Sequence, residues 1–376
     1  MNYWETYHLS DICRFVTSRT CNIENYISTE NMLPNKDGIT SLSNIPNGSA
    51  IAYQLGDVLI SNIRPYFQKI WQANCDGACS ADVLCIRANE KADCKYLYYL
   101  LSQQKFFDYV MSGAKGCKMP RGDKSQIMQW QISLPPLAEQ KRIADILSAI
   151  DDKIELNRRI NANLEQQAQA LYKSWFVDNK KDDWEEGVAS DYFNITIGKT
   201  PPRKETKWFS TSNKDHVWIS ISDMGKHGMY LGQSSEYLTQ SAIEKFNIVI
   251  VPDKTVLLSF KLTIGRVVIS DGNVTTNEAI AHFNTNDQNL LEYTYLSLKN
   301  YEFSALGSTS SIATAVNSKT IKSMRWIMPN HYLIKQFHEK VGPLFNMIRQ
   351  NEKEINNLST LRDTLLPKLM SGEITV

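Results

Sequence analysis

Residues that could carry catalysis occur in this chain only as incomplete patterns. The stretch GCKMPRGDKS from Gly116 to Ser125 comes nearest to a phosphate-binding loop, but its glycines are spaced too widely and Asp123 stands where the lysine belongs. The stretch VPDK from Val251 to Lys254 has the start of a metal-dependent nuclease motif without the acidic-x-lysine partner on a neighbouring strand. Dinucleotide-binding and amino-methyltransferase motifs are absent. These patterns predict a chain that makes and breaks no bonds itself.

Histidine and cysteine residues give no metal-site or nucleophile pattern either. The six histidines are scattered along the chain. The seven cysteines all lie in the first third, at Cys13, Cys21, Cys75, Cys79, Cys85, Cys94 and Cys117. An odd number at irregular spacing predicts reduced thiols instead of a disulfide framework, and the Cys75–Cys79 pair has no second pair at zinc-site spacing.

Local groups of basic residues are the strongest functional signal. The glycine-containing loop 113–124 carries Lys115, Lys118, Arg121 and Lys124. The segment 197–208 carries Lys199, Thr200, Arg203, Lys204 and Lys207. Two further turns carry Arg64 with Lys69, and Lys261 with Arg266. Such clusters, beside glycines that let the backbone approach a phosphate, predict nucleic-acid contact, although each alone also fits an ordinary solvated loop.

A hydroxyl-rich segment, 307–319, occupies the place in the second half of the chain that the basic loop occupies in the first. Its candidate contacts are Thr309, Ser310, Ser311 and Lys319. Hydroxyl groups bind base edges as well as phosphates, so two loops of different chemistry predict two different half-sites. The net charge of only +1 means that DNA contact must come from these local groups.

Two similar α/β segments present these groups. Residues 1–133 and 181–328 each combine short β-rich runs with an amphipathic helix, a pattern that predicts a compact domain. Their features recur in the same order. Val58–Ser61 matches Val256–Ser259, and the tryptophan-glutamate pair at position 4 matches the pair at 184. This repeat predicts the order globule, helix, globule, helix.

Two long amphipathic helices follow the globular segments. We expect the first within the region 134–180, from Leu134 to Asp178, and the second within 329–376, from His331 to Met370. At about 1.5 Å per residue the first would span roughly 60 Å. Two equivalent apolar stripes favour an antiparallel coiled-coil rod with a globule at each end. The alternative is that each helix packs only on its own globule.

The chain resembles the specificity (S) subunits of type I restriction-modification enzymes. The resemblance rests on LPPLAEQKRIADILSAID at 134–151, IGKTPP with VWISISDM between 197 and 224, and LLPKLMSGEI at 365–374. It extends over essentially the whole chain in the family's order. Two places depart from the family pattern: no GxTP-like stretch stands near Cys21, and 328–337 reads MPNHYLIKQF.

The resemblance implies a non-catalytic DNA-recognition subunit. Residues 1–133 and 181–328 would be target recognition domains, each reading one half of a bipartite double-stranded site. The helical regions 134–180 and 329–376 would separate the half-sites and dock two modification (methyltransferase) subunits, which restriction (translocase and nuclease) subunits join. S-adenosylmethionine, ATP and Mg would be bound by those partners. A stand-alone nuclease or methyltransferase and a coiled-coil scaffold without DNA are the alternatives.

Composition agrees with a folded, water-soluble protein. With 42% apolar residues in 376, the chain can build two or three cores. It has no apolar run long enough for a membrane span, and its start lacks the basic-then-apolar pattern of a signal peptide. We therefore expect a cytoplasmic protein without a membrane partner.

Overall fold

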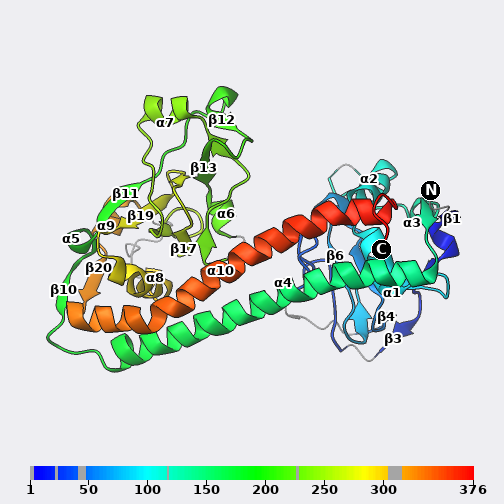
Figure 1. Cartoon of the computed structure of the whole chain (residues 1–376), viewed down its shortest axis with the longest axis horizontal. Coiled ribbons are helices and arrows are strands. Elements are labelled where there is room, and N and C mark those ends of the chain that lie inside the picture. The colour runs from blue at the N-terminus through cyan, green and yellow to red at the C-terminus, as the bar shows by residue number, and fades with distance from the viewer. Residues whose placement is uncertain (1–3, 22–23, 41–47, 117, 226–227, 304–315) are drawn as a thin grey trace. The chain divides into compact units, whose positions relative to one another are not determined.

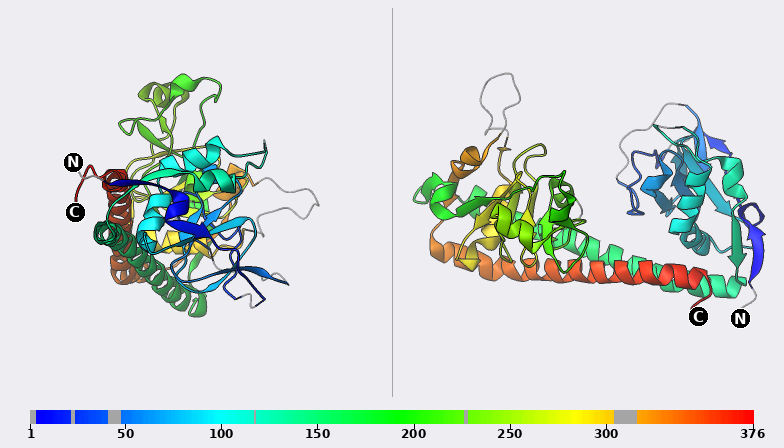
Figure 2. Two further views of the ribbon diagram at one scale, coloured as in Figure 1. Left: turned by 90° about the vertical axis from the view of Figure 1, so that its right-hand side faces the viewer. Right: turned by 90° about the horizontal axis from the view of Figure 1, so that it is seen from above.

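The computed structural model describes residues 4–21, 24–40, 48–116, 118–225, 228–303 and 316–376 (Figure 1). It divides into two compact units. Unit 1 comprises Met1–Glu155 and Asn356–Val376, and unit 2 comprises Leu156–Ile355. Both chain ends therefore belong to unit 1 (Figure 2). Within this unit, Gly372 lies close to the ring of Trp4. No helix in the described part of the chain is long and apolar enough to cross a membrane.

Unit 1 is built from small antiparallel sheets and short helices. Its main sheet has the order β2–β8–β5–β6, formed by Cys13–Phe15, Val83–Ala88, Val58–Ser61 and Ile70–Gln72. A second sheet, β3–β4–β7, consists of Arg19–Thr20, Ala50–Tyr53 and Gly77–Cys79. The helices are α1 (Cys94–Leu101), α2 (Gln104–Ser112) and α3 (Lys124–Met128). The carboxylates of Asp93 and Asp123 cap α1 and α3 by accepting two backbone N–H groups each, which is why these helices begin where they do.

Unit 2 repeats this plan with a larger sheet and more connecting elements. The five-stranded sheet β11–β19–β16–β17–β14 consists of Asn194–Ile197, Ile280–Asn284, Val256–Ser259, Val267–Ser270 and Tyr230–Leu231. A second sheet, β12–β15–β13–β18, consists of Phe209–Ser210, Tyr237–Leu238, His216–Ile219 and Thr275–Thr276. The helices include α5 (Ala189–Tyr192), α6 (Ile221–Met224), α7 (Gln240–Phe246), α8 (Leu291–Lys299) and α9 (Ser318–Lys322).

The internal repeat is visible in strand pairing. In unit 1, β1 (Glu5–His8) pairs antiparallel with β9 (Gln131–Leu134), and in unit 2, β10 (Glu185–Val188) pairs the same way with β20 (Arg325–Met328). The turn after each first strand is closed identically. The carboxylate of Asp11 accepts from the backbone N–H of His8, and that of Asp191 accepts from Val188. Equivalent sequence positions therefore make equivalent contacts.

The long helices are α4 (Leu137–Tyr172) and α10 (His331–Met370). Helix α4 begins three residues later than expected, because Leu134 belongs to β9 and pairs with Glu5. Two prolines, Pro135 and Pro136, then separate strand from helix. At its other end α4 continues into a π-helical stretch, Lys173–Asp178. The expected pair of long helices is present, with the start of the first corrected.

Helices α4 and α10 pack against each other and run antiparallel. In unit 2, Asn157 donates to Glu354 at 2.8 Å and Asn351 donates to Asn161 at 2.8 Å. The residue number of the partner on α10 therefore decreases as the residue number on α4 increases, as in an antiparallel pair. In unit 1, Asp151 pairs with Arg362 at 2.8 Å. The expected helix pairing is confirmed.

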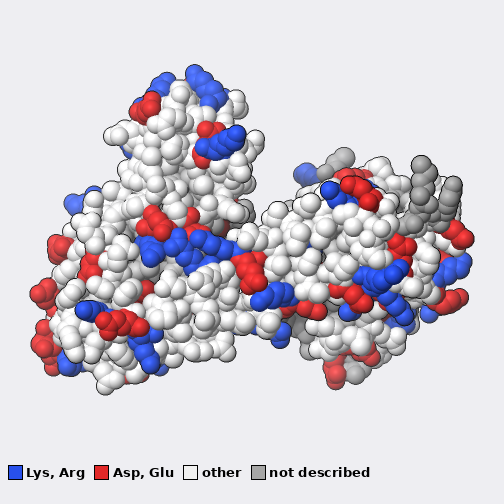
Figure 3. All heavy atoms as spheres, in the orientation of Figure 1, with Lys and Arg blue, Asp and Glu red and all other residues white. Residues whose placement is uncertain are grey.

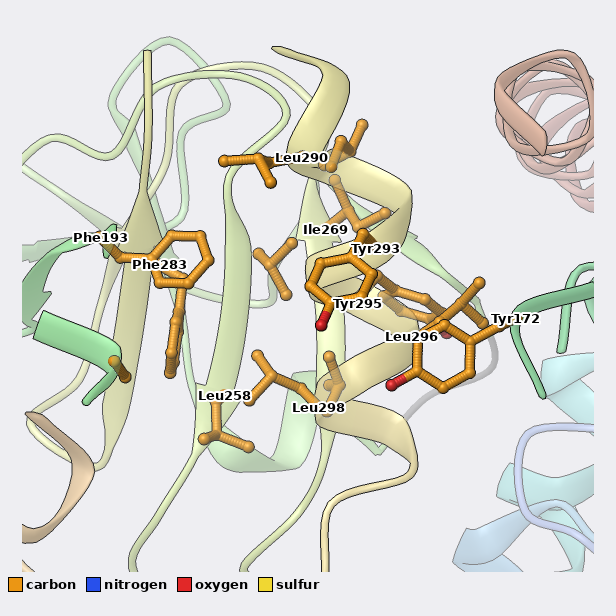
Figure 4. Packing of buried hydrophobic residues seen from close by; sticks show 14 of the residues in the cluster. Tyr172, Phe193, Leu258, Ile269, Phe283, Leu290, Tyr293, Tyr295, Leu296 and Leu298 are labelled. Atoms are coloured by element: carbon orange, nitrogen blue, oxygen red, sulfur yellow. The ribbon is translucent and has the colours of Figure 1, made fainter. Parts of the chain in front are cut away.

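Each long helix also supplies residues to the core of both units. In unit 1, Ile143 and Leu147 of α4 join Leu369 of α10 in a core cluster with the first α/β domain. In unit 2, Tyr172 at the end of α4 packs on Tyr293 and Leu296 of α8, as Figure 4 shows. The alternative that each helix packs only on its own globule is therefore wrong.

Candidate nucleic-acid interface

In unit 1 the structure brings two predicted groups together. The turn after β5, residues 62–69, is called turn 1 here, and the basic loop is residues 113–124. The backbone N–H of Arg64 donates to the carbonyl of Pro120 at 2.8 Å, and Ile63 forms a β-bridge with Arg121. Turn 1 and the basic loop therefore form one continuous surface, although about fifty residues separate them in the sequence.

Most basic side chains of this surface have partners within unit 1, but the pairs are exposed. Lys115 contacts Asp123 at 2.6 Å and is 82% exposed, while Arg121 contacts Asp82 at 2.9 Å and is 53% exposed. The Asp123 carboxylate raises the pKa of Lys115 through their hydrogen bond, so this side chain stays charged. Because solvent-exposed pairs of this kind contribute little to the stability of a fold, a phosphate can replace the carboxylate at little cost.

The other candidate cations of turn 1 and the basic loop differ in whether they bind their own domain or extend into solvent. The ammonium of Lys69 donates to the Thr29 carbonyl at 2.7 Å, and burial lowers its pKa, so Lys69 fastens a neighbouring turn. Lys124 is the first residue of α3 and lies 5.9 Å from the ring centre of Phe15. Lys118 and Arg64 are exposed. Lys69 is thus the weakest candidate of the six for DNA contact.

Turn 1 holds two residues in the left-handed backbone region. Arg64 and Gln68 both have φ of 51°, on either side of a short 3-10 turn that exposes Tyr66 and Phe67. For residues with a side chain this conformation costs roughly 1–2 kcal/mol, and such strain concentrates at functional sites. Residue types alone do not predict this conformation, since neither residue is glycine or asparagine.

In unit 2 the segment 197–208 lies at the end of the unit that carries α7 and β12. Figure 3 shows lysine and arginine side chains gathered there. A small aromatic cluster lies at this end of the unit, and three of the predicted residues bind groups of their own domain there or nearby. Lys199 donates to the Phe246 and Asn247 carbonyls at the end of α7, and Thr200 donates to Glu278. The guanidinium of Arg203 stacks on two rings and pairs with Glu236 at 2.7 Å.

The exposed part of this cluster includes a lysine that sequence reasoning missed. The ammonium groups of Lys207 and Lys245 each lie 4.7 Å from the Trp208 ring centre, and Lys204 is exposed nearby in the sequence. Lys245 lies on α7, far from 197–208 in sequence, so only the fold brings it to Trp208. We call Lys204, Lys207 and Lys245 the basic tip.

The turn after β16, residues 260–266, is called turn 2 and corresponds to turn 1. Lys261 is exposed and lies 5.5 Å from the Phe260 ring centre. Arg266 instead donates to the Ile221 carbonyl at 2.6 Å and is half-buried, so it holds turn 2 against α6. Leu262, which was not a candidate, is 96% exposed.

The hydroxyl-rich loop is only partly described. Thr309, Ser310 and Ser311 lie outside the described residues. Lys319 is exposed in the first turn of α9, whose N-terminus is capped by the Asn317 side chain. Phe303, just before the loop, lies beside Gly265 of turn 2. In unit 2, turn 2 therefore lies next to the residue at which the described chain stops before the hydroxyl-rich loop.

No cluster of three or more potential metal ligands occurs among the described histidine, cysteine, aspartate and glutamate residues. His282 is fully buried between the hydroxyls of Thr196 and Thr276, at 2.8 and 2.7 Å, and burial lowers its pKa to about 4. It is therefore neutral and structural. The six cysteines that the structure describes, all but Cys117, are free thiols.

Comparison with known proteins shows what this arrangement is similar to. A family model described as type I restriction modification DNA specificity domain matches twice, at residues 1–166 and 181–358. The HindI specificity subunit of Haemophilus influenzae is 25% identical over 464 aligned positions that cover all of both chains. The MjaIX specificity subunit of Methanocaldococcus jannaschii is 27% identical, covering 75% of this chain and 69% of that protein.

A solved structure shares the fold. The S subunit of a type I restriction-modification system from M. genitalium superposes with a TM-score of 0.52 at 14% identity, covering 98% of this chain and 96% of that one. At this identity the likeness concerns the fold alone.

Proposed function

Because the chain belongs to the family of type I restriction modification DNA specificity domains and is the specificity subunit of such a system, we propose that each α/β domain reads one half of a bipartite DNA site. The recognition domains are residues 1–133 and 181–328. The helical regions 134–180 and 329–376 hold them apart. The chain is a non-catalytic part of the enzyme, which replaces the alternatives of a stand-alone enzyme and of a scaffold without DNA.

The observation that carries this proposal is the repeated surface beside the central strand. In unit 1 the turn that follows the strand lies next to the basic loop, and in unit 2 the corresponding turn lies next to Phe303. The two surfaces differ in chemistry: Lys115, Lys118 and Arg121 contribute charge in unit 1, whereas turn 2 presents Lys261 beside an apolar side chain. One geometry with two chemistries is what two different half-sites require.

The proposed contacts follow from the exposure of each side chain. Residues with exposed cationic groups contact the DNA directly, and they are Arg64, Lys115, Lys118, Arg121, Lys124, Lys204, Lys207, Lys245, Lys261 and Lys319. Residues bound to their own domain act indirectly, by fixing its surface, and they are Lys69, Lys199, Thr200, Arg203 and Arg266. Thr309, Ser310 and Ser311 stay candidates for the second half-site.

The chain is a component of a type I restriction-modification complex. Within it, two modification subunits dock on the outer faces of α4 and α10, and restriction subunits join this core. Large apolar side chains are exposed on these helices, among them Leu156 at 44%, Met347 at 49% and Leu361 at 47%. Partially exposed apolar residues on a helix suit a protein interface. S-adenosylmethionine, ATP and Mg belong to the partner subunits in this family.

Co-expression with the cognate modification subunit tests the proposal. Genome-wide mapping of methylated adenine should give one bipartite motif that disappears when this chain is omitted. Exchange of residues 181–328 for the same segment of a relative should change only one half-site. A motif that is independent of the chain, or one without a spacer, would refute the proposal.

The helices can be tested in the same assay. Removing one heptad from α4 and the facing heptad from α10 should shorten the unspecified spacer while both half-sites stay unchanged, because about 10 Å of helix is lost. An insertion of seven residues in the segment 179–184, between the π-helical stretch and β10, is a change of the same size outside the two helices and should leave the spacer unaltered.

A further inference from the structure

The two turns are each held by the hydrogen bonds of a buried serine at the end of the central strand. In unit 1 the Ser61 hydroxyl donates to the Ile63 carbonyl at 3.0 Å, and the Ser61 N–H donates to the Lys69 backbone carbonyl across the turn at 3.0 Å. In unit 2 the Ser259 hydroxyl donates to the Thr263 carbonyl at 2.6 Å and accepts from the Arg266 N–H at 3.0 Å. Each serine is at most 3% exposed. Both turns are therefore held in a fixed shape before any ligand arrives.

The third residue after each serine has the left-handed backbone conformation. It is Arg64 in turn 1, with φ of 51°, and Leu262 in turn 2, with φ of 60°. Glycine or asparagine would adopt this conformation without the penalty that arginine and leucine bear. The same position of the repeat is thus occupied in both units by a residue that is unfavourable in the left-handed conformation. The two residues, arginine and leucine, differ in chemistry. We call it the apex position.

The apex side chains point to solvent. Leu262 is 96% exposed, and among the described residues with positive φ other than glycine it alone has an apolar side chain. A leucine that is rigidly held in water and strained contributes nothing to the core of unit 2. Its neighbours on turn 2, Lys261 and Thr263, are exposed as well. A partner that is acidic overall but has small apolar groups fits this turn.

We propose that the apex position is a specificity-determining position in both recognition domains. This rests on the proposed function of the two units. The guanidinium of Arg64 donates to the N7 and O6 acceptors of guanine, and the side chain of Leu262 packs on the 5-methyl group of thymine. The first half-site then contains a guanine and the second a thymine at the base pair facing the turn.

A phosphate contact and a protein contact are the competing roles. Leucine has no group that binds a phosphate, so a phosphate role does not explain why both apex residues bear the conformational penalty. A docked protein surface would cover Leu262 without changing which bases are read. Base reading alone predicts that each apex residue controls one base pair of one half-site.

Glycine substitutions test this without endangering the fold. Leu262→Gly and Arg64→Gly remove the side chain while relieving the backbone strain, so unfolding temperatures should stay within roughly 3 °C of wild type. Each variant is co-expressed with the modification subunit, and methylated adenine is mapped. Lys254→Gly is the matched control, since Lys254 also has positive φ, at 60°, but lies outside turn 2.

With Leu262→Gly, discrimination for thymine at one position of the second half-site should fall roughly tenfold or more, and the first half-site should stay intact. Arg64→Gly should relax one guanine of the first half-site only. Unchanged motifs, or lower methylation with the same motif, would overturn the proposal and leave the turns to phosphate or subunit contact. A wild-type chain that gives no bipartite motif would instead refute the proposed function itself.

Discussion

A single carboxylate joins three elements of unit 1, and its removal should loosen all three. Asp151 of α4 accepts from the Tyr99 hydroxyl of α1 at 2.7 Å and from the Arg362 guanidinium of α10 at 2.8 Å. Tyr99 is 4% exposed, and the side chains of Arg362 and Asp151 are 22% and 28% exposed. The first α/β domain, the start of α4 and the end of α10 therefore share one polar junction.

The expected losses follow from what each substitution leaves unpaired. Asp151→Ala removes the shared partner of the Arg362 guanidinium and the buried Tyr99 hydroxyl. Removing one partner of a buried ion pair costs about 3–5 kcal/mol. Because this pair is partly exposed and Arg362 keeps a contact with Asp363 at 2.9 Å, we expect no more than the lower end of that range, about 3 kcal/mol. Tyr99→Phe removes only one hydrogen bond to a charged group and should cost about 1.5 kcal/mol. The double variant should cost less than the sum of the two.

Hydrogen–deuterium exchange in the full chain separates unit 1 from unit 2 and measures these losses locally. Backbone amides of α1 and of the last three turns of α10 should exchange faster in Asp151→Ala, while amides of α8 in unit 2 stay protected. Asp145→Ala, an exposed aspartate on the same helix, is the control and should change little. If Asp151→Ala costs less than 1 kcal/mol, or if the two losses simply add, the junction does not hold these elements together.

Three further predictions concern unit 2. Burial raises the pKa of Glu352 to about 7 from an ordinary 4.5, so the folded state binds this proton more tightly than the unfolded state does. The free energy of unfolding should therefore fall by about 2 kcal/mol as the pH rises from 4.5 to 7. Calorimetry of Glu352→Gln should show a smaller fall. Phe337→Ala should destabilise unit 2 by about 3–5 kcal/mol in urea unfolding, because the buried Phe337 ring packs with its centre 4.8 Å from the ring centre of Phe176. A loss below about 1 kcal/mol would contradict that packing. Lys207→Gln and Lys245→Gln should each lower the salt dependence of DNA binding by the assembled complex by roughly one, and an unchanged slope would assign both lysines to packing on Trp208.

The sequence was sufficient to predict the repeat and the long helices because both depend on local periodicity. Ile143 and Ile154 belong to the apolar residues whose helical spacing predicts the first helix, and they are buried in the structure, whereas Ile146 of the same set is 38% exposed. The start of α4 was predicted three residues early, since an apolar residue such as Leu134 suits a helix and a strand equally well. The pairing of Leu134 with Glu5 places it in strand β9, and this contact joins residues that are far apart in the sequence.

The candidate surface was harder to predict, because charge in a sequence does not reveal where a side chain goes. Lys199 and Arg203 look like phosphate ligands in IGKTPPRK, but the fold uses one to close α7 and the other to cover Trp218. Lys245 joins the basic tip from a distant helix. Leu262 had no signal at all, because the left-handed conformation of a leucine is imposed by Ser259 and by the turn around it.

The polar residues between the long helices explain how a spacer can have a fixed length. Apolar stripes alone allow two helices to slide by a heptad with little loss of contact. In unit 2, however, Asn157 is 1% exposed and donates to Glu354, and Asn161 accepts from Asn351 one turn further along. A shift of α10 by one turn would separate both pairs, and each buried group left unpaired costs about 1–3 kcal/mol. The register of α4 against α10 is therefore set by these amides, which gives the helices that we propose as the spacer one preferred alignment.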